Sequence, residues 1–364
     1  MFDPQIWAAV PFHFWSGVFF VLGTMIGSLL NVCIYRLPRG ESIVFPPSHC
    51  PTCNYRIPWY LNIPLVTWIG LRGRCANCQA PISVRYFLVE LLTGLLFLGT
   101  WLTYGHRSPG VALVYCLVLS GFIVATFIDF EHFIIPDEVT LGGTVVGLLL
   151  SAAVPALHSA PTRAEALRQS FIGVLAGAGI IYAILRLGKL LFGRQRIALE
   201  PGSKVVFTES VLLLPDQEIP YEEIFYRKSD TIALEADTVE LIDRCYARCS
   251  VRLSPQSLRV DQDVFDPERI PQFEVITRQV ILPREAMGLG DVKFMAAIGA
   301  FLGWKAVLFS LMLSAVLGSI VGVTLITLHR SAWSSRIPYG PYIALAATIW
   351  IFAGRRLLAW YAGL

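Results

Sequence analysis

The feature that most constrains the fold of this chain is a series of apolar runs, each about twenty residues long and almost free of charge. An α-helix of that length crosses the roughly 30 Å hydrocarbon layer of a bilayer. Only 15% of the 364 residues are charged, whereas soluble domains carry about 25%. We therefore expect an all-α polytopic membrane protein with about eight transmembrane helices. The expected helices cover residues 15–35, 84–104, 111–130, 139–154, 171–191, 289–304, 306–328 and 339–353.

Positive charge is concentrated between the first two apolar runs. This segment holds a single acid, Glu41, and six arginines. Because Lys and Arg in short loops favour the cytoplasmic side, we expect this segment in the cytoplasm and the protein to cross the membrane several times. The arginines are Arg36, Arg39, Arg56, Arg72, Arg74 and Arg85.

Acidic charge gathers in a different stretch. Residues 197–287 hold 17 of the 26 acids but only 10 of the 29 Lys and Arg residues. The stretches KVVFTESVLLL, DTIALEAD and FEVITRQVIL alternate as strands do. We therefore expect a strand-rich cytoplasmic insert. The expected division is 1–35 for the first helix, 36–83 for a cysteine-containing cytoplasmic domain, 84–193 for helices two to five, 194–287 for the insert and 288–364 for the last three helices.

Two C-x-x-C pairs lie in the first cytoplasmic segment. Cys50 and Cys53 precede Cys75 and Cys78, with 21 residues between the pairs. Such pairs bring their sulfurs to one point, and two of them form the four-thiolate cage that suits zinc. Disulfides are the alternative, but they rarely persist on the reducing side of the membrane. We expect a structural Zn²⁺ site, because four protein ligands leave no position for a reacting water.

Two aspartates stand at the ends of apolar runs. Asp129 closes the third run and Asp291 opens the sixth, and the expected topology places both at the cytoplasmic boundary. Two carboxylates a few ångströms apart in a poorly hydrated site cannot both ionise, so they share one proton, as in aspartic proteases. This arrangement activates a water and polarises a peptide carbonyl. The alternative is a proton or ion pathway in a transporter, where membrane carboxylates also occur.

The residues around Asp291 suggest contacts with a substrate. Gly288 and Gly290 permit the close approach of an extended peptide. Lys293 is expected either to hold Asp291 ionised or to bind an acidic group of the substrate. The alternative is a lysine that extends its side chain toward the membrane surface.

Five motifs in order make the sequence resemble the type IV prepilin leader peptidase/N-methyltransferase family of GxGD-type membrane aspartic proteases. They are MIGSLLNVCIYRLP, the CPTC…CANC…PISVRYFLVELLTG block, FIDFEHFIIPD, GLGDVK and IPYGPYIALA. The resemblance implies that Asp129 and Asp291 are catalytic. It also implies a bacterial inner-membrane enzyme that cleaves prepilins or pseudopilins after a glycine at the cytoplasmic boundary.

The resemblance further implies N-methylation of the new N-terminus with S-adenosylmethionine. The candidate residues for methyl transfer are Gly73, Asn31, Arg85, Tyr86 and Glu90. The candidate substrate contacts at the start of the last helix are Tyr339, Gly340 and Pro341. Expected partners are the substrates, the lipid bilayer and components of pilus or type II secretion assembly, with no nucleic acid. A peptidase without methyltransferase activity remains an alternative.

Overall fold

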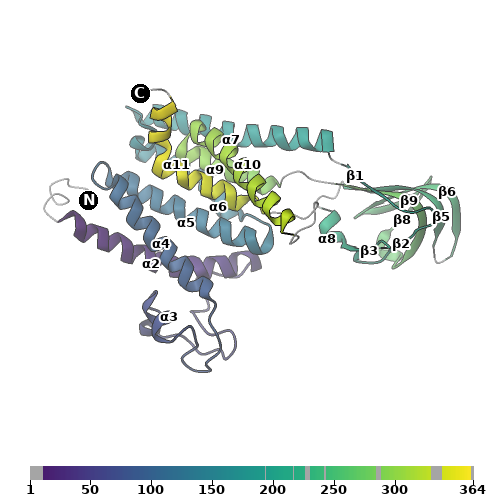
Figure 1. Ribbon diagram of the computed structural model, residues 1–364, viewed down its shortest axis with the longest axis horizontal. Coiled ribbons are helices and arrows are strands. Elements are labelled where there is room, and N and C mark those ends of the chain that lie inside the picture. The colour runs from purple at the N-terminus through teal and green to yellow at the C-terminus, as the bar shows by residue number, and fades with distance from the viewer. Residues whose placement is uncertain are drawn as a thin grey trace. The chain divides into compact units, whose positions relative to one another are not determined.

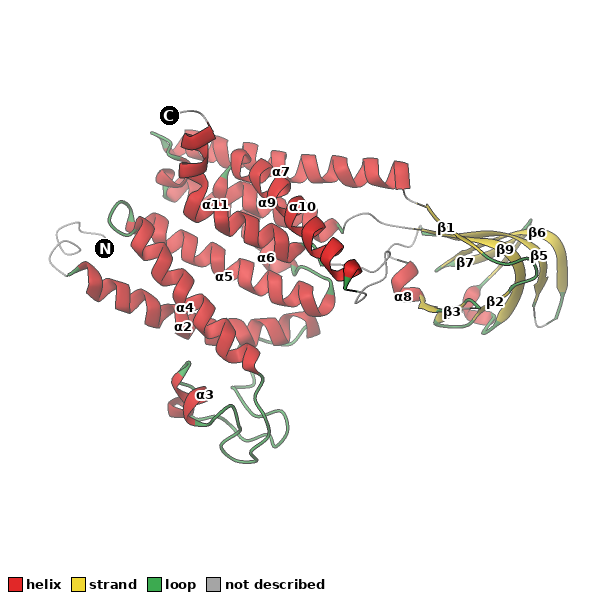
Figure 2. Ribbon diagram, in the orientation of Figure 1, coloured by secondary structure: helices red, strands yellow, loops and turns green. Residues whose placement is uncertain are grey.

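The computed structural model describes residues 11–192, 194–215, 217–225, 230–241, 243–283, 288–328 and 338–361. It divides into two compact units. The first unit comprises Met1–Tyr182 and Leu289–Leu364, and the second comprises Ala183–Gly288. Among the described residues, the strands all belong to the second unit (Figure 2).

The first unit is built from long helices that pack side by side (Figure 1). Shorter elements occupy the connections: η1 (Leu37–Arg39), η2 (Trp59–Leu61), α3 (Val66–Gly70) and η3 (Pro155–His158). The long helices are α2 (Phe12–Arg36), α4 (Val84–Tyr104), α5 (Pro109–His132), α6 (Asp137–Ala153), α7 (Arg163–Phe192), α9 (Leu289–Leu302), α10 (Trp304–Thr327) and α11 (Gly340–Tyr361), of which α7 continues into the second unit.

The predicted all-α fold with about eight transmembrane helices is wrong. A helix occurs at each of the eight expected places, but in the described part of the chain only five are long and apolar enough to cross a membrane. The 17 residues of α6 and the 14 residues of α9 reach only about 25 and 21 Å. The uninterrupted apolar part of α11, Gly340–Gly354, is also too short. The five spans are Phe12–Arg39, Val84–Tyr104, Pro109–His132, Arg163–Leu190 and Trp304–Thr327.

The second unit adds a nine-stranded antiparallel sheet, so the fold is mixed α/β. The strand order is β4-β3-β2-β9-β5-β6-β7-β8, and β1 also pairs with β9. The unit also contains α8 (Tyr221–Ile224) and η4 (Pro267–Arg269). The strands are β1 (Arg194–Ala198), β2 (Lys204–Phe207), β3 (Val211–Leu213), β4 (Glu218–Pro220), β5 (Ile232–Glu240), β6 (Cys245–Ser254), β7 (Ser257–Val260), β8 (Asp263–Phe265) and β9 (Phe273–Pro283).

Alternating side chains give this sheet one buried face. Along β6, Cys249, Val251 and Leu253 are buried while the residues between them are exposed. The rings of Phe207 and Phe273, which face each other in the register of β2 and β9, stack with centroids 4.5 Å apart. The three alternating stretches noted in the sequence form β2 with β3, β5 and β9. The second unit therefore has a hydrophobic core of its own.

Helices α7 and α9 cross with their backbones in contact. A Cβ atom added to Gly173 would lie 2.0 Å from the carbonyl oxygen of Gly299, and one added to Gly177 would lie 2.3 Å from that of Met295. Small residues spaced four apart commonly mediate helix association in membranes, because the hydrophobic effect does not drive helices together in lipid. The contact buries α9 inside the helical unit and so positions Asp291 in its first turn.

Helices α2 and α4 pack in the same way. A Cβ atom on Gly23 would lie 2.8 Å from the Cα of Gly94, and one on Gly27 would lie 2.7 Å from the Cα of Glu90. This close crossing brings the N-terminal half of α4, which carries Glu90, against the C-terminal half of α2.

Replacing Gly173 with alanine tests the α7–α9 crossing. We expect Gly173→Ala to lower the free energy of unfolding by about 1–3 kcal/mol, because its methyl group must push the two backbones apart. Gly179→Ala is the matched control on the same helix, since nothing lies within 4 Å of its added Cβ and alanine favours helix. Thermal unfolding in detergent compares the two. Equal stability of both variants would contradict the crossing.

Candidate active site and metal centre

Asp129 lies in the last turn of α5 and is held by the start of α11. Its carboxylate oxygen Oδ2 accepts a hydrogen bond of 2.9 Å from the backbone N–H of Gly340. That N–H belongs to the first turn of a helix, where backbone donors have no partner within the helix and where the helix dipole attracts negative charge. A Cβ atom at Gly340 would lie 2.7 Å from Oδ2, so the contact requires glycine. Asp129 is only 6% exposed.

Asp291 lies in the first turn of α9 and is 8% exposed. Its neighbour Gly290 packs against Ile135, since a Cβ there would lie 3.6 Å from the Cβ of Ile135. Gly340 packs against the same side chain, with 3.1 Å from its added Cβ to Cδ1 of Ile135. Ile135 is thus contacted by one glycine adjacent to Asp291 and by another that binds Asp129. The ends of α5, α9 and α11 therefore meet at one place.

Tyr339 lies beside the same site. Its hydroxyl group is 2.9 Å from the Oγ atom of Ser314 on α10. Burial raises the pKa of Tyr339, and the negative charge of Asp291 raises it further, so the hydroxyl stays protonated at neutral pH. Pro341 follows Gly340 as a buried residue in the first turn of α11. Both residues therefore border the aspartates.

Lys293 forms an ion pair with an acid other than Asp129 and Asp291. Its ammonium Nζ donates to Oδ1 of Asp137 over 2.7 Å, which joins the first turns of α9 and α6. The structure thus provides a partner for Lys293 other than Asp291. Gly288 precedes α9 and is exposed.

The two cysteine pairs adopt matching turns. Cys50 donates its backbone N–H to Tyr55, and Asn54 donates its N–H back to the carbonyl of Cys50. In the second turn, Cys75 donates to Ala80 and Gln79 donates to Cys75. Asn54 and Gln79, each following the second cysteine of its pair, have positive φ angles of 55° and 60°. The same backbone turn therefore presents each pair.

The four thiols converge and are all free. The Sγ atoms of Cys50 and Cys78 are 3.8 Å apart, those of Cys53 and Cys75 are 4.0 Å apart, and all four lie within 4.8 Å of one another. Tetrahedral ligands at the usual Zn–S distance of about 2.3 Å would be separated by about 3.8 Å. Backbone N–H groups of Cys53 and Thr52 lower the pKa of Cys50 to about 6, which favours its thiolate form. The cage therefore fits a tetrahedral metal ion.

The candidate methyl-transfer residues gather where α2, α4 and the cysteine-containing loop meet. The Nδ2 atom of Asn31 on α2 donates over 3.0 Å to the backbone carbonyl of Tyr86 on α4. Arg85 forms an ion pair with Glu131, which lies two residues after Asp129 in α5. This ion pair connects the start of α4 to the end of the helix that carries the first aspartate.

Glu90 and Gly73 shape the loop that covers this junction. The carboxylate Oε2 of Glu90 accepts a 2.8 Å hydrogen bond from the backbone N–H of Leu65, the residue before α3. Gly73 has a φ angle of +67°, and a Cβ there would lie 2.9 Å from the ring of Trp68. Both the backbone conformation and the ring contact require glycine at this position.

Three buried polar atoms at this junction have no hydrogen-bond partner within the described part of the chain: Oδ1 of Asn31, Nε1 of Trp68 and Nε of Arg85. Asn31 is only 1% exposed. A buried polar group without a partner costs about 1–3 kcal/mol, so native proteins seldom leave several of them together. The acceptor and two donors fit a polar ligand such as S-adenosylmethionine, which carries both kinds of group.

Sequence reasoning missed several residues that the structure brings into these sites. Glu131 and Asp137 lie within the motif FIDFEHFIIPD, and their charge at a membrane boundary was the available signal. Ile135, Leu65 and Trp68 had no such signal, because an apolar side chain in a loop or in a short connecting helix gives no indication of its contacts.

Comparison with known proteins adds independent information. The family model described as "Bacterial Peptidase A24 N-terminal domain" matches residues 21–104. The model described as "Type IV leader peptidase family" matches residues 116–197 and 272–323. The gap in the second match covers most of the sheet of the second unit.

Several relatives are named prepilin leader peptidase/N-methyltransferase. The protein from Aeromonas hydrophila is 29% identical over 97% of this chain and 95% of its own length. The one from Dichelobacter nodosus is 33% identical over 49% of this chain and 69% of its own length. The one from Myxococcus xanthus is 42% identical over 51% of this chain and 52% of its own length. No solved structure matches.

Replacing one cage cysteine tests the metal centre. We expect the parental chain to bind about one metal ion. The Cys75→Ser variant should lose most of this metal, because a tetrahedral structural site needs all four ligands. The thermal midpoint should fall with it, since metal binding stabilises the loop fold. Elemental analysis of purified protein measures the metal. Cys245→Ser is the control, because that thiol is exposed and lies outside the cage. Equal metal content in both variants would refute the assignment.

Proposed function

Because this chain belongs to the type IV leader peptidase family, and therefore cleaves and N-methylates prepilins, we propose that Asp129 and Asp291 carry out the cleavage. The observation that supports this assignment is the meeting of α5, α9 and α11 around Ile135 and Gly340. It brings two buried carboxyl groups from distant parts of the sequence to one boundary of the helical unit.

The geometry assigns separate tasks to the oxygens of this pair. The N–H of Gly340 holds Oδ2 of Asp129, which leaves Oδ1 to contact the reacting water or the other carboxyl group. One carboxylate removes a proton from the water, whose oxygen adds to the scissile carbonyl carbon. The carboxylic acid of the pair donates to the carbonyl oxygen as negative charge develops there. The carbon–nitrogen bond then breaks, and the leaving amine takes a proton from the pair.

We place this chemistry at the cytoplasmic face of the bacterial inner membrane. The segment from Arg36 to Arg85, which joins the first two spans and includes their adjoining ends, holds six arginines and one acid, and this favours the cytoplasm for the loop that joins α2 to α4. Arg85, in the first turn of α4 where that loop ends, pairs with Glu131 near Asp129. The aspartates and the loop therefore share one boundary, where the basic leader of a prepilin or pseudopilin would remain after its apolar helix enters the membrane.

The junction of α2, α4 and the loop is our proposed site for methyl transfer. When bound, S-adenosylmethionine would supply an electrophilic methyl group: the bond to the nitrogen of the new N-terminal amine would form as the sulfonium S–CH3 bond breaks, leaving S-adenosylhomocysteine, and the nitrogen would release a proton. Asn31, Arg85 and Trp68 offer buried polar atoms to the donor molecule. Glu90 and Gly73 hold the covering loop in place through Leu65 and Trp68. The Arg85–Glu131 pair keeps this junction next to Asp129, so the cleaved chain has a short path to the methyl donor.

We assign the metal in the cysteine cage as Zn²⁺. Four sulfur ligands at these separations suit its tetrahedral preference, and all four positions are taken by protein. The ion would therefore maintain the fold of the loop that carries Gly73 and Trp68, and would not bind a reacting water.

Neutralising each aspartate tests the peptidase assignment. We expect Asp129→Asn and Asp291→Asn each to reduce prepilin cleavage by at least about 100-fold, because each variant removes one half of the proton-sharing pair. Cleavage of a prepilin in membranes, followed by gel shift, measures the rate. Glu138→Gln is the control, as an exposed acid close to the same boundary. Cleavage at the parental rate by either aspartate variant would disprove the assignment.

Replacing Gly73 separates the two activities. We expect Gly73→Ala to slow methylation about tenfold. An alanine held at positive φ, together with its clash with Trp68, would raise the free energy of the folded site by at least about 1.4 kcal/mol. Cleavage should persist. Gly70→Ala is the matched control, since nothing lies within 4 Å of its added Cβ. Intact mass of the mature pilin reports cut site and methyl group together. Equal methylation by both variants would argue against a role for Gly73.

A further inference from the structure

A cavity lies away from the aspartates, and none of the residues that line it belongs to the proposed sites of cleavage or methyl transfer. Its volume is about 460 Å³, which is sufficient for a small polar ligand. Tyr115, in its wall, precedes Asp129 by 14 residues along α5, or about 21 Å along the helix axis. Leu302, also in its wall, is the last residue of α9, whose first turn carries Asp291. The cavity is therefore at the other end of the helices.

The residues around the cavity mark a boundary of the membrane. Tyr104 is the last residue of one span and Trp304 is the first residue of another. Trp350 and Tyr115 add two more aromatic side chains with polar atoms to the wall. Trp and Tyr are enriched at the level of lipid headgroups, where one end of the side chain is apolar and the other contacts water. The cavity therefore opens at headgroup level.

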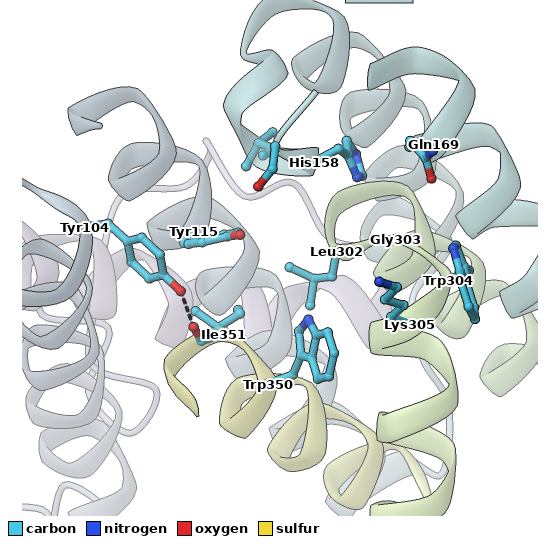
Figure 3. A pocket seen from close by; sticks show the side chains of 12 residues that line it. Tyr104, Tyr115, His158, Gln169, Leu302, Gly303, Trp304, Lys305, Trp350 and Ile351 are labelled. Carbon is cyan, nitrogen blue, oxygen red and sulfur yellow. Dashed lines mark hydrogen bonds between the residues drawn. The ribbon is translucent and has the colours of Figure 1, made fainter. Parts of the chain in front are cut away.

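The charge in the cavity is positive. Lys305 is a wall residue, and no Asp or Glu is among the residues that line the cavity. Within the described part of the chain, Lys305 forms no ion pair, and its ammonium lies 5.9 Å from the ring centroid of Trp304. Figure 3 shows the ammonium of Lys305 and the indole nitrogen of Trp350 directed toward Leu302, in the middle of the wall. The cavity thus presents donors to an anion.

His158 contributes a neutral polar group to the same wall. Its Nε2 atom lies 2.9 Å from Oγ of Ser151. Burial lowers the pKa of His158, so the imidazole is uncharged at neutral pH. Lys305 is then the cation in the wall that an anionic ligand would meet. The amide Nε2 of Gln169, another wall residue, already donates over 2.8 Å to Glu165.

One face of α10 continues from the cavity as an exposed apolar surface. Leu308 and Met312 follow Lys305 at three and seven residues, a spacing that places them on the same side of a helix. They are 39% and 71% exposed. A cation at the head of such a stripe matches a phospholipid, whose phosphate lies at the boundary and whose acyl chains lie along the membrane-facing helix. A free phosphate ion would make no use of this stripe.

We propose that this cavity binds the phosphate-bearing headgroup of a membrane phospholipid in the leaflet opposite the aspartates. Lys305 pairs with the phosphate, Trp304 and Trp350 contact the glycerol region, and the acyl chains lie against Leu308 and Met312. A bound lipid stabilises the turn at Gly303 between α9 and α10, and so the helix that carries Asp291.

Lipid-dependent stabilisation of the purified, delipidated full chain tests the proposal. We expect phosphatidylglycerol to raise the thermal midpoint of the parental protein by about 3–5 °C, as a ligand well above its Kd does. The rise should be at least halved in Lys305→Gln and kept in Lys305→Arg, which retains the charge. Arg107→Gln is the matched control, an exposed cation in the turn after α4 that does not line the cavity.

Two further ligands separate the sources of stabilisation. Diacylglycerol with the same acyl chains should raise the midpoint less than half as much, since it lacks the phosphate. Inorganic phosphate alone should give no rise. An equal effect of diacylglycerol would overturn the role of the phosphate, and an equal effect of inorganic phosphate would overturn the role of the lipid. An equal rise in the parental protein and Lys305→Gln would place any lipid elsewhere. Size-exclusion elution and the midpoint in detergent alone report whether each variant is folded.

Discussion

The backbone contact between Gly173 and Gly299 is the interaction on which the arrangement of the helical unit depends. In a membrane, apolar side chains gain little by leaving lipid for protein, so close packing of backbones has to supply the association energy. This crossing encloses α9 and thereby determines the position of both its ends. One end carries Asp291, and the other leads through Gly303 into α10 at the cavity lined by Lys305.

The boundary at the first end brings two chemistries together. Gly340 supplies an N–H group to Asp129, and the Arg85–Glu131 pair joins the same helix to the junction below the metal-binding loop. Proteolysis creates an amine and methylation consumes it, so a single boundary suits both steps. The loop contributes through its fold: its metal cage and the Glu90–Leu65 hydrogen bond hold it over α2 and α4.

Features set by neighbouring residues could be predicted from the sequence, whereas contacts between residues far apart in the chain could not. The C-x-x-C spacing indicated the convergence of four thiols, because each pair occupies one local turn. Apolar runs located the helices but not their lengths in the membrane. Residues 292–328 form one nearly uncharged stretch, and Gly303, with a φ angle of 79°, divides it into α9 and α10. The pairing of Lys293 with Asp137 joins residues 156 apart, which no local pattern reveals.

The short length of α6 has a consequence for the supply of water to the peptide bond. Its outer face exposes Leu141, Val145 and Leu149, yet the helix reaches only about 25 Å against a hydrocarbon layer of roughly 30 Å. A bilayer accommodates such hydrophobic mismatch by thinning locally, at a free-energy cost of a fraction of a kcal/mol per Å of mismatch. Because α6 begins a few residues after Asp129, a bilayer that thins around α6 would bring water close to the aspartates. Hydrolysis needs water as a reactant, and a locally thinner hydrocarbon layer would let water reach the peptide bond.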